Sequence, residues 1–500
     1  MALKSKLVKP FARIISSKID REARKAVKIQ ESLRQKLVHQ ASNTLFGKDH
    51  WFSEIRTYKD FKSNVPVRDY EGLKPYITKI VEGQPDILWK GRPAYLAKTS
   101  GTTSGVKYIP ISKESAPHHV GTARNMVFHH IAKTGHSDWM DGKMIFLSGS
   151  PELTQTNGIA TGRLSGIVNH LIPGWLKSNR LPSYETNCIE DWETKLDHII
   201  DETIDQNMTM ISGIPPWVQM YYERLLDRSG KSNILELFPN YSLFVYGGVN
   251  FEPYRAKLEE LVGASIKSLE TYPASEGFIA FQDRLDDPGL LLNVNVGIFY
   301  EFVPVDEIFS ENPTRLSLGE VELGTNYALI INSNSGLWGY NIGDTVKFVS
   351  TDPYRLVVTG RVKHFISAFG EHVIGKEVEE AMLDVAKAEN IRIVEFTVAP
   401  QVNPPDGSTP YHEWFVEFDN LPENMTEFAK KVDLKMTEQN IYYLDLIEGN
   451  ILQPLKIRPM QPNAFRNYMK TQGKLGGQNK VPRLSNDRKI ADQLEPYTIK

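Results

Sequence analysis

The chain has 500 residues, of which 41% are hydrophobic and 24% are charged, and its formal net charge is -3. This composition is typical of a globular protein, and the balanced charge argues against nucleic acid as the main partner. The single cysteine, Cys188, excludes an intramolecular disulfide framework and a cysteine-based zinc or iron–sulfur cluster, and it fits a reducing cytoplasm.

The N-terminal segment is predicted to be helical, as are most of the first 60 residues. Its apolar residues recur at the spacing of one helix face: Ile14, Ile15, Ile19, Ala23, Ala26 and Val27. Charged residues interrupt them, so the segment lacks the apolar run of a signal peptide. No stretch of the chain approaches the roughly 20 apolar residues that span a bilayer. We expect an amphipathic helix that packs on its own domain; a role at a membrane surface is the alternative.

The middle of the chain is predicted to alternate between strands and helices. Four short apolar runs are predicted as strands: 144–148, 208–212, 242–248 and 327–333. Three periodic stretches are predicted as helices: 190–206, 215–229 and 252–262. This alternation implies crossover connections and a sheet that is parallel at least in part. The segment 151–166 is rich in glycine, threonine and serine and is predicted as a loop.

The C-terminal part shows a different order of elements. A helix is predicted from Lys376, a strand at 391–400, a loop at 402–410, a strand at 413–420 and a helix at about 423–440. This is the pattern of a compact α+β unit, and we place the domain boundary near Gly360–Lys363. The sequence therefore predicts a large domain over residues 1–360 and a small one over residues 361–500.

A glycine- and hydroxyl-rich loop lies in the segment KTSGTTSGVKYIPIS, Lys98–Ser112. Glycines allow backbone N–H groups to approach an anion, and hydroxyls add donors, so the loop suits the phosphates of a nucleotide. It is not a Walker A loop, because the GK[ST] ending is missing. The strand-like YIPI that follows indicates that the loop joins two strands; an ordinary turn is the alternative.

A second loop lies in ETYPASEGFIAFQ, Glu270–Gln282. Its carboxylate Glu276 can hold Mg²⁺ beside a phosphate loop, and the ring of Tyr272 can stack on a purine. The alternative is a solvated surface glutamate.

Two further loops complete the set. In GLWGYNIGDTVKFV, Gly336–Val349, Asp344 follows Gly343 in a predicted turn between two strands, and one carboxylate can accept hydrogen bonds from both ribose hydroxyls. The alternative is a hairpin turn that uses Gly-Asp for its geometry. The segment Val357–Met382 lies at the predicted domain boundary, and its alternative is a charged linker.

The order of these motifs resembles that of adenylate-forming enzymes over nearly the whole chain: SGTTSG, YxxSEG, YxxGD and GRxK…GExV…EVE. Within that superfamily the chain is most similar to the auxin-responsive acyl acid–amido synthetase family (Gretchen Hagen three), in its bacterial branch. The similarity rests on TSGTTSGVKYIP, SGIPPWV (212–218), GVNFEPY (248–254) and QPLKIRPM (453–460). The resemblance implies an α/β fold, with a large N-terminal domain of mixed sheets and helices and a smaller mobile α+β domain.

The resemblance also implies an activity, that of an ATP-dependent acyl acid–amido synthetase. Such an enzyme adenylates a small carboxylic acid with release of pyrophosphate and then conjugates the acyl group to an amino acid with release of AMP. Carboxylate and triphosphate are both negative, so cations, including Mg²⁺, must screen their approach. The alternatives are an acyl- or aryl-CoA ligase with the same first step, and a protein that binds a nucleotide or acid without turnover.

The nucleotide site is assigned residue by residue from the resemblance. The phosphate loop comprises Ser100, Gly101, Thr102, Thr103 and Ser104. Tyr272, Ala274 and Ser275 border the adenine and the α-phosphate. Glu276 is the expected Mg²⁺ ligand, Asp344 binds the ribose with help from Arg361, and Lys363 is the hinge residue between the domains. The ATP and acyl acid sites are expected in the large domain.

A catalytic lysine near the C-terminus is also implied. Lys480, in GGQNKVPRL (476–484), is assigned this role, with Lys474 and Lys489 as competitors. The acyl pocket is assigned to Trp217, Val249 and Phe251, and the amine side to Gln453, Pro454 and Leu455.

Other groups and partners are expected as follows. Arg163 or Arg124 is a candidate for pairing with an acid group of the substrate, and a surface salt bridge is the alternative. The histidine pairs His118–His119 and His129–His130 lack metal-binding spacing and are expected to be surface or structural residues. We expect a cytoplasmic monomer whose partners are a small carboxylic acid and an amino acid, with no nucleic-acid or membrane partner.

Overall fold

The computed structural model describes residues 3–100, 106–172, 179–248, 251–287, 289–362, 365–366, 373–402, 404–406, 408–448, 451–475, 480–485 and 487–499. The chain divides into two compact units. The N-terminal unit comprises Met1–Phe251, Lys257–Ile342 and Val346–Val357, and the C-terminal unit comprises Glu252–Ala256, Gly343–Thr345 and Val358–Lys500. The long segment of the C-terminal unit thus begins at Val358. The predicted hinge residue, Lys363, lies outside the described residues.

An eleven-stranded sheet runs through the N-terminal unit, in the order β12-β13-β14-β15-β11-β10-β9-β8-β7-β3-β6. Its parallel part consists of β6 (Arg180–Leu181), β3 (Lys143–Phe146), β7 (Met208–Ser212), β8 (Leu243–Gly247) and β9 (Lys267–Ala274). Its remaining strands are β10 (Gly277–Gln282), β11 (Leu290–Leu292), β12 (Ile298–Pro304), β13 (Asn326–Ser333), β14 (Tyr340–Thr351) and β15 (Tyr354–Arg361). Antiparallel pairing joins β9 to β10, β10 to β11, β11 to β15 and β12 to β13. All four predicted strands are present, and the parallel part is as expected.

Helices cross between the parallel strands, as the right-handed βαβ connection requires. They are α9 (Tyr184–Cys188), α10 (Trp192–Thr203), α11 (Pro215–Ser229), α12 (Ile234–Leu237) and α13 (Glu252–Val262). The predicted helices at 215–229 and 252–262 are confirmed with the same bounds. Short 3₁₀ helices lie at Asp138–Asp141, Val305–Glu307 and Leu318–Glu320.

A second, four-stranded sheet corrects one prediction. Its order is β2-β1-β5-β4, with β2 at Val106–Ile111, β1 at Tyr95–Ser100, β5 at Ile159–Gly162 and β4 at Thr154–Thr156. The segment predicted as a loop, 151–166, therefore forms a hairpin and the start of helix α7 (Leu164–Leu171). Asn157 and Gly158 have φ values of 47° and 80°, which are the left-handed values that a two-residue hairpin turn needs.

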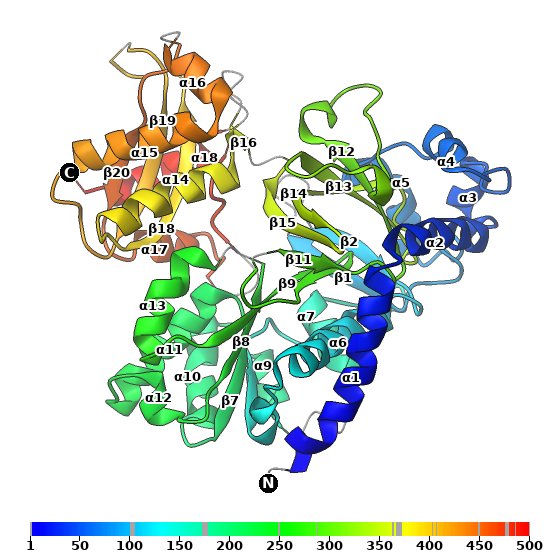
Figure 1. Ribbon diagram of the computed structural model, residues 1–500, viewed down its shortest axis with the longest axis horizontal. Coiled ribbons are helices and arrows are strands. Elements are labelled where there is room, and N and C mark those ends of the chain that lie inside the picture. Colours follow the sequence, from blue (N-terminus) through cyan, green and yellow to red (C-terminus); the bar gives the residue numbers. More distant parts are fainter. Residues whose placement is uncertain are drawn as a thin grey trace. The chain divides into compact units, whose positions relative to one another are not determined.

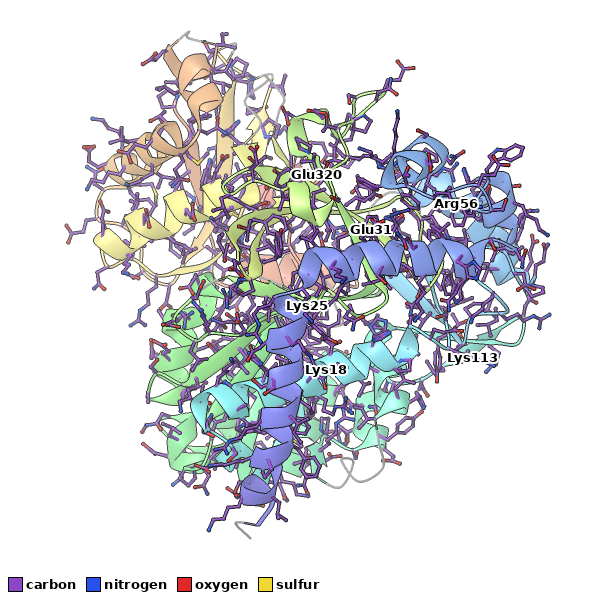
Figure 2. The ribbon with its side chains drawn as sticks, turned by 45° about the vertical axis from the view of Figure 1, so that its right-hand side comes forward. Lys18, Lys25, Glu31, Arg56, Lys113 and Glu320 are labelled. Atoms are coloured by element: carbon purple, nitrogen blue, oxygen red, sulfur yellow. The ribbon has the colours of Figure 1, made fainter. Side chains whose placement is uncertain are left out.

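Six helices precede or follow the first strands of this unit. They are α1 (Leu3–Ala23), α2 (Ala26–Ala41), α3 (Leu45–Asp49), α4 (Tyr58–Asn64), α5 (Tyr70–Val81) and α6 (Ala116–Thr134). Figure 1 shows α1 lying along α6, and Figure 2 shows α1 and α2 meeting near Lys25. The helical prediction is confirmed for the N-terminal segment, which forms two helices. Of the predicted apolar residues, Ile19 and Ala23 pack against the same apolar cluster as the buried Val8 and Ala12, and Ala26 is buried. Ile14 and Val27 are exposed, contrary to the prediction.

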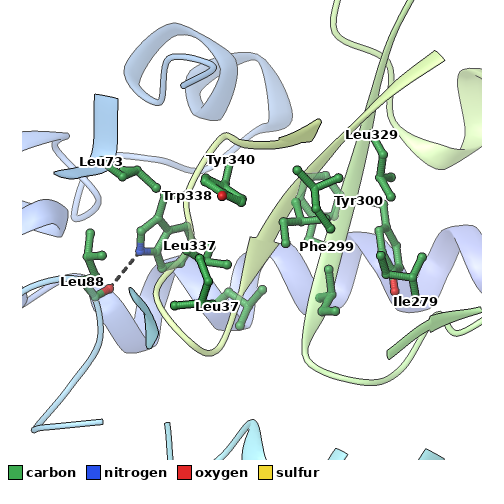
Figure 3. Close-up of a cluster of buried hydrophobic side chains, with 14 of the residues drawn as sticks. Leu37, Leu73, Leu88, Ile279, Phe299, Tyr300, Leu329, Leu337, Trp338 and Tyr340 are labelled. Carbon is green, nitrogen blue, oxygen red and sulfur yellow. Dashed lines mark hydrogen bonds between the residues drawn. The ribbon is translucent and has the colours of Figure 1, made fainter. Parts of the chain in front are cut away.

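Aromatic side chains join the N-terminal helices to the large sheet. Trp338 is fully buried, and its indole N–H donates a 2.9 Å hydrogen bond to the carbonyl oxygen of Leu88 (Figure 3). Gly339 follows it with a φ of 56°, and a Cβ there would lie 2.3 Å from the carbonyl oxygen of Pro66. Only glycine fits this close approach of two backbones.

A buried ion pair stabilises the same region. The Arg315 guanidinium donates to both carboxylate oxygens of Glu301 at 3.1 and 2.7 Å, and the side chains are 6% and 0% exposed. Tyr58 and Asn332 donate to the same carboxylate, each at 2.9 Å. The carboxylate is thus held by four hydrogen bonds in a buried site.

The C-terminal unit has helices on both faces of a three-stranded sheet (Figure 1). The sheet order is β18 (Ile393–Gln401), β19 (Tyr411–Phe418) and β20 (Lys456–Met460). Helices α14 (Gly375–Ala388) and α15 (Met425–Gln439) contribute to the apolar cluster on one face, and α17 (Ala464–Thr471) and α18 (Lys489–Leu494) to that on the other. The unit also contains α16 (Ile441–Glu448), the strand pair β16 (Phe365–Ile366) and β17 (Val373–Ile374), and a 3₁₀ turn at Glu495–Tyr497. The predicted α+β order is therefore present.

Candidate active site

The proposed phosphate loop connects two paired strands. β1 and β2 run antiparallel, and Ser100 is the register partner of Val106 at the end of the pair. The prediction that the loop joins two strands is therefore confirmed. Gly101, Thr102, Thr103 and Ser104 lie outside the described residues, so their assignment stays a prediction.

The second motif forms the turn between β9 and β10. Gly277 is the register partner of Ala274, which places Ser275 and Glu276 at the tip of the turn, where both are half-buried. A Cβ on Gly277 would lie 2.3 Å from Ile298 Cδ1, so a larger residue directly after Glu276 would have to displace that buried side chain. Tyr272 is buried within the large apolar cluster of this unit.

The Glu276 carboxylate fits a magnesium ligand. It is a hard oxygen donor at an accessible turn, and Mg²⁺ is usually held by one or two carboxylates together with phosphates and water. Within the described part of the chain, no three His, Cys, Asp or Glu side chains come together as a metal cluster. This arrangement is consistent with a metal bound by a single carboxylate together with the substrate phosphates.

The third motif differs from its predicted conformation. Gly343 and Asp344 lie inside β14, and the turn between β14 and β15 is at Asp352–Pro353, so the predicted turn at Gly343–Asp344 is wrong. The reason is that Gly343, with a φ of 87°, disturbs the strand without ending it.

Asp344 lies beside Arg361, the last residue of β15. The guanidinium Nε of Arg361 is 3.4 Å from Asp344 Oδ1, and the arginine side chain is half exposed while the carboxylate is largely buried. The resemblance assigned these two residues to one ribose site, and the structure brings them together. The ribose role itself stays a prediction.

The Lys480 segment is fixed to β18 by backbone pairing. Val398 N–H donates to the Arg483 carbonyl oxygen at 2.9 Å, and Ser485 N–H donates to the Val398 carbonyl oxygen at 2.9 Å. The Thr397 hydroxyl donates to the Pro482 carbonyl oxygen at 2.7 Å. The segment that follows Lys480 therefore behaves as an added short strand of the small sheet.

The side chain of Arg483 strengthens this attachment. Its Nε donates to Glu379 Oε1 at 2.7 Å, its Nη1 pairs with Glu395, and its guanidinium lies 4.6 Å from the ring centroid of Phe396. The Tyr254 hydroxyl donates to the other oxygen of Glu395 at 2.8 Å. Two carboxylates and an aromatic ring thus hold an arginine only three residues from Lys480.

Lys480 is electrostatically coupled to the Asp344–Arg361 pair. Burial of its ammonium group lowers the pKa of Lys480, Asp344 raises it and Arg361 lowers it further. The residue as a whole nevertheless keeps exposed surface. Because Lys480 is exposed as a residue, the charges of Asp344 and Arg361 say more about its role than its burial does. The structure thus brings three of the predicted site residues together in one unit.

The predicted acyl-pocket residues lie beyond the carboxyl ends of β7 and β8, where open α/β sheets bind ligands. Trp217 is buried with its ring centroid 4.9 Å from that of Trp192, and Phe251 is buried 4.6 Å from the ring of Tyr246. Both have core partners, and Val249 lies outside the described residues. Their pocket role stays a prediction.

The predicted amine-side residues also have structural partners. Gln453 Nε2 donates to the carbonyl oxygen of Thr409 at 2.8 Å, and Leu455 N–H donates to Asp433 Oδ1 at 2.9 Å. Leu455 is buried in the core of the C-terminal unit, whereas Pro454 is exposed. These contacts fix the segment locally, and the amine-side role stays a prediction.

One buried cation was not found from the sequence. Lys195, on α10, is 2% exposed and donates to the carbonyl oxygens of Ser148 and Asn187 at 2.9 and 2.7 Å. Burial lowers the pKa of Lys195 to about 8, with Cys188 raising it and Arg163 lowering it. The lysine lies just beyond the end of β3, and within the described residues no carboxylate pairs with it. A lone lysine in a helical sequence gives no signal of this position.

The remaining predicted groups are resolved as follows. Arg163 is exposed, and Arg124 donates to the side-chain oxygen of the neighbouring Asn125. His119, His129 and His130 are buried, which agrees with the structural alternative of the prediction.

Comparisons with known proteins complete the description of the site. Three family models match the chain: the GH3 family N-terminal domain at residues 15–178 and 164–266, the central domain at 291–361 and the C-terminal domain at 376–489. Jasmonoyl–L-amino acid synthetase GH3.5 of Oryza sativa subsp. japonica is 22% identical, with 93% of each chain covered. Indole-3-acetic acid-amido synthetase GH3.15 of Arabidopsis thaliana is 21% identical, with 94% of this chain and 92% of the relative covered.

Solved structures share the fold. The AtGH3.15 acyl acid amido synthetase in complex with 2,4-DB has a TM-score of 0.81 at 16% identity, covering 98% of this chain and 96% of that one. A 2-hydroxyisobutyryl-CoA ligase in the postadenylation state has a TM-score of 0.55 at 11% identity, covering 96% and 91%. Both structures therefore share the overall fold of this chain.

Proposed function

The chain belongs to the GH3 family, and we propose that it is an ATP-dependent acyl acid–amido synthetase that works through an acyl-adenylate. The proposal is supported by relatives that are named as amino acid conjugating synthetases over more than nine-tenths of this chain. The observation that carries it is the convergence of Asp344, Arg361 and Lys480 in one unit. The carboxylate can accept hydrogen bonds from the ribose hydroxyls, and the two cations can screen the acid carboxylate and the phosphate as they approach each other.

In the first half-reaction the chain must bring two anions together. The hydroxyls and backbone N–H groups of Ser100–Ser104 hold the phosphates, and Asp344 accepts hydrogen bonds from the ribose hydroxyls while Arg361 orients its carboxylate. The Lys480 ammonium donates to the acid carboxylate and to an α-phosphate oxygen, which stabilises the charge that develops as pyrophosphate leaves. Magnesium, held by Glu276, supplies further charge neutralisation when bound.

In the second half-reaction the amine nitrogen of the amino acid attacks the acyl carbon. The new carbon–nitrogen bond forms as the bond from that carbon to the AMP oxygen breaks, and the ammonium proton is lost to solvent. The acyl group lies against Trp217, Val249 and Phe251, and Gln453–Leu455 border the amine. Lys363 is the hinge residue between the two domains.

The activity is tested with purified protein, ATP·Mg²⁺ and a panel of carboxylic acids. The panel includes jasmonic acid, indole-3-acetic acid and 2,4-DB, because those acids appear in the names of the relatives. Each acid is combined with the twenty amino acids or with CoA, pyrophosphate and AMP are followed, and products are identified by mass. An acyl–amino acid product is expected. A thioester formed only with CoA would move the chain to the CoA ligases.

The lysine assignment has its own test. Lys480→Ala is expected to abolish acid-dependent pyrophosphate release while the Kd for ATP stays unchanged. Lys474→Ala and Lys489→Ala are matched controls, because both lysines lie near the C-terminus. Activity that survives Lys480→Ala but is lost in either control would reassign the catalytic lysine.

A further inference from the structure

Helix α1 carries an exposed apolar stripe that the proposed reaction does not use. Leu7, Phe11 and Ile14 are 61%, 66% and 69% exposed, and their i, i+4, i+7 spacing places them on one face of the helix. Their three side chains span about 10 Å along the axis, at 1.5 Å per residue. Single exposed apolar residues are normal on a protein surface, but a contiguous row of three large ones marks an interaction site.

The opposite face of α1 is fixed to the protein. Val8 and Ala12 are buried in an apolar cluster that includes residues of α6, and Ser16 Oγ lies 3.1 Å from His129 Nδ1 of that helix. Ser5 N–H donates to Asp141 Oδ1 at 3.3 Å. Because these contacts hold the helix in one rotation, the stripe of Leu7, Phe11 and Ile14 cannot turn inward without breaking them.

The surroundings of the stripe are basic. Lys6, Lys9 and Arg13 are exposed on one side of it. Lys18, labelled in Figure 2, follows it on the next turn. No acidic residue precedes Asp20 in the sequence. Within the described part of the chain, the ion pairs of α1 join Lys18 to Glu22 at 3.8 Å and Asp20 to Lys133 at 2.8 Å, and neither involves Lys6, Lys9 or Arg13.

We propose that this face of α1, comprising Leu7, Phe11, Ile14 and the flanking basic residues, binds the surface of an anionic lipid bilayer. A helix with a narrow apolar stripe and a flank rich in lysine and arginine is suited to lie in the plane of the interface. No described helix is long and apolar enough to cross a membrane, so the helix lies on the bilayer and does not span it.

Charge distinguishes this occupant from a second copy of the chain. Two α1 helices facing each other would place basic side chains against basic side chains, with no acidic residue on either stripe to compensate. An anionic headgroup layer supplies the opposite charge for every one of them, and each lysine or arginine near such a surface strengthens binding by about fivefold. The bilayer therefore satisfies both the apolar and the basic parts of the face.

The test is co-sedimentation of the full chain with vesicles of phosphatidylcholine alone and of phosphatidylcholine mixed with phosphatidylglycerol. We expect binding to the mixed vesicles only, with loss of binding at high salt. Leu7→Ser should weaken partitioning about tenfold, the equivalent of removing one apolar side chain from the interface. Leu434→Ser is the matched control, because Leu434 is 59% exposed on α15 of the C-terminal unit, and it should bind as the parent does.

Three outcomes would overturn the proposal. They are equal binding to both vesicle types, no binding to either, and a concentration-dependent dimer that Phe11→Ser dissolves, which would make a second copy the occupant. Acid-dependent pyrophosphate release serves as the folding control, because Leu7 and Phe11 are remote in sequence from every motif of the proposed reaction. A variant that keeps that activity but loses vesicle binding has lost the surface and not the fold.

Discussion

Replacing Arg315 by methionine should leave a buried carboxylate without its counter-ion. Glu301 is fully buried, and in Arg315→Met it would keep the hydrogen bonds from Tyr58 and Asn332 but lose both from the guanidinium. Breaking a buried pair by removing one partner typically costs about 3–5 kcal/mol.

Protonation of Glu301 in the variant sets the size of the stability loss and its dependence on pH. Glu301 can take up a proton, which at pH 7 costs about 3.7 kcal/mol for a group whose ordinary pKa is about 4.3, at about 1.36 kcal/mol per unit. At pH 5 the same uptake costs about 1 kcal/mol. In the variant, folding favours the protonated form of Glu301, so the free energy of unfolding decreases as the pH rises. The deficit relative to the parent should therefore shrink from about 4 to about 1 kcal/mol between pH 7 and pH 5.

The assay is urea unfolding of both proteins at the two pH values, followed by tryptophan fluorescence, with the slope of each transition compared. Arg224→Met is the matched control. Arg224 also donates two hydrogen bonds to one carboxylate, that of Asp197, at 2.8 and 2.6 Å, but these side chains are 43% and 41% exposed. It should lose at most about 1 kcal/mol. Equal losses for the two arginines, or an Arg315→Met deficit that does not change with pH, would refute the reasoning.

Three further predictions concern burial, close approach and positioning. Burial lowers the pKa of His130 from 6.5 to about 4. Between these pH values the unfolded chain binds one more proton than the folded chain, so the free energy of unfolding falls as the pH drops. In His130→Gln, urea unfolding should show a decrease between pH 6.5 and pH 4 that is smaller by about 3 kcal/mol. Gly339→Ala should lower the free energy of unfolding by at least about 2 kcal/mol, because the new Cβ would lie against the Pro66 carbonyl oxygen. Gly91→Ala should lower it by only about 1 kcal/mol, because Gly91 has a φ of 71° but open space around it. Arg483→Lys should slow acid-dependent pyrophosphate release about tenfold or more with an unchanged Kd for ATP, because a lysine cannot bridge two carboxylates; an unchanged rate would show that Lys480 is positioned independently.

The elements that could be predicted from the sequence are those with an unambiguous period. The strand Met208–Ser212 and the helices Pro215–Ser229 and Glu252–Val262 have the predicted bounds, because continuous apolar runs or helical spacing are bounded by glycine and proline there. The hairpin at Asn157–Gly158 carried a turn signal of its own, but its strands are only three and four residues long and too polar to be recognised.

The errors share a physical origin in tertiary packing. In α1, Ile19 and Ala23 lie on the face that packs on the N-terminal unit, as their spacing predicted, whereas Ile14 lies outside that face and is 69% exposed. Helical spacing identifies an amphipathic helix, but it does not fix how wide a strip of the helix the rest of the protein covers. For the site, the pairing of Asp344 with Arg361 followed from motif order, whereas the buried position of Lys195 depends on the carbonyl groups of two distant segments.

The backbone pairing of the Lys480 segment gives that lysine a very short tether. Only Val481 separates it from Pro482, whose carbonyl oxygen is already bonded to β18, and two residues of fully extended chain reach at most about 7 Å. Any displacement of the lysine backbone beyond that radius must carry β18 and the helices packed on it. The reach of the lysine is thus set by the rigid body to which it is attached and not by the freedom of a tail.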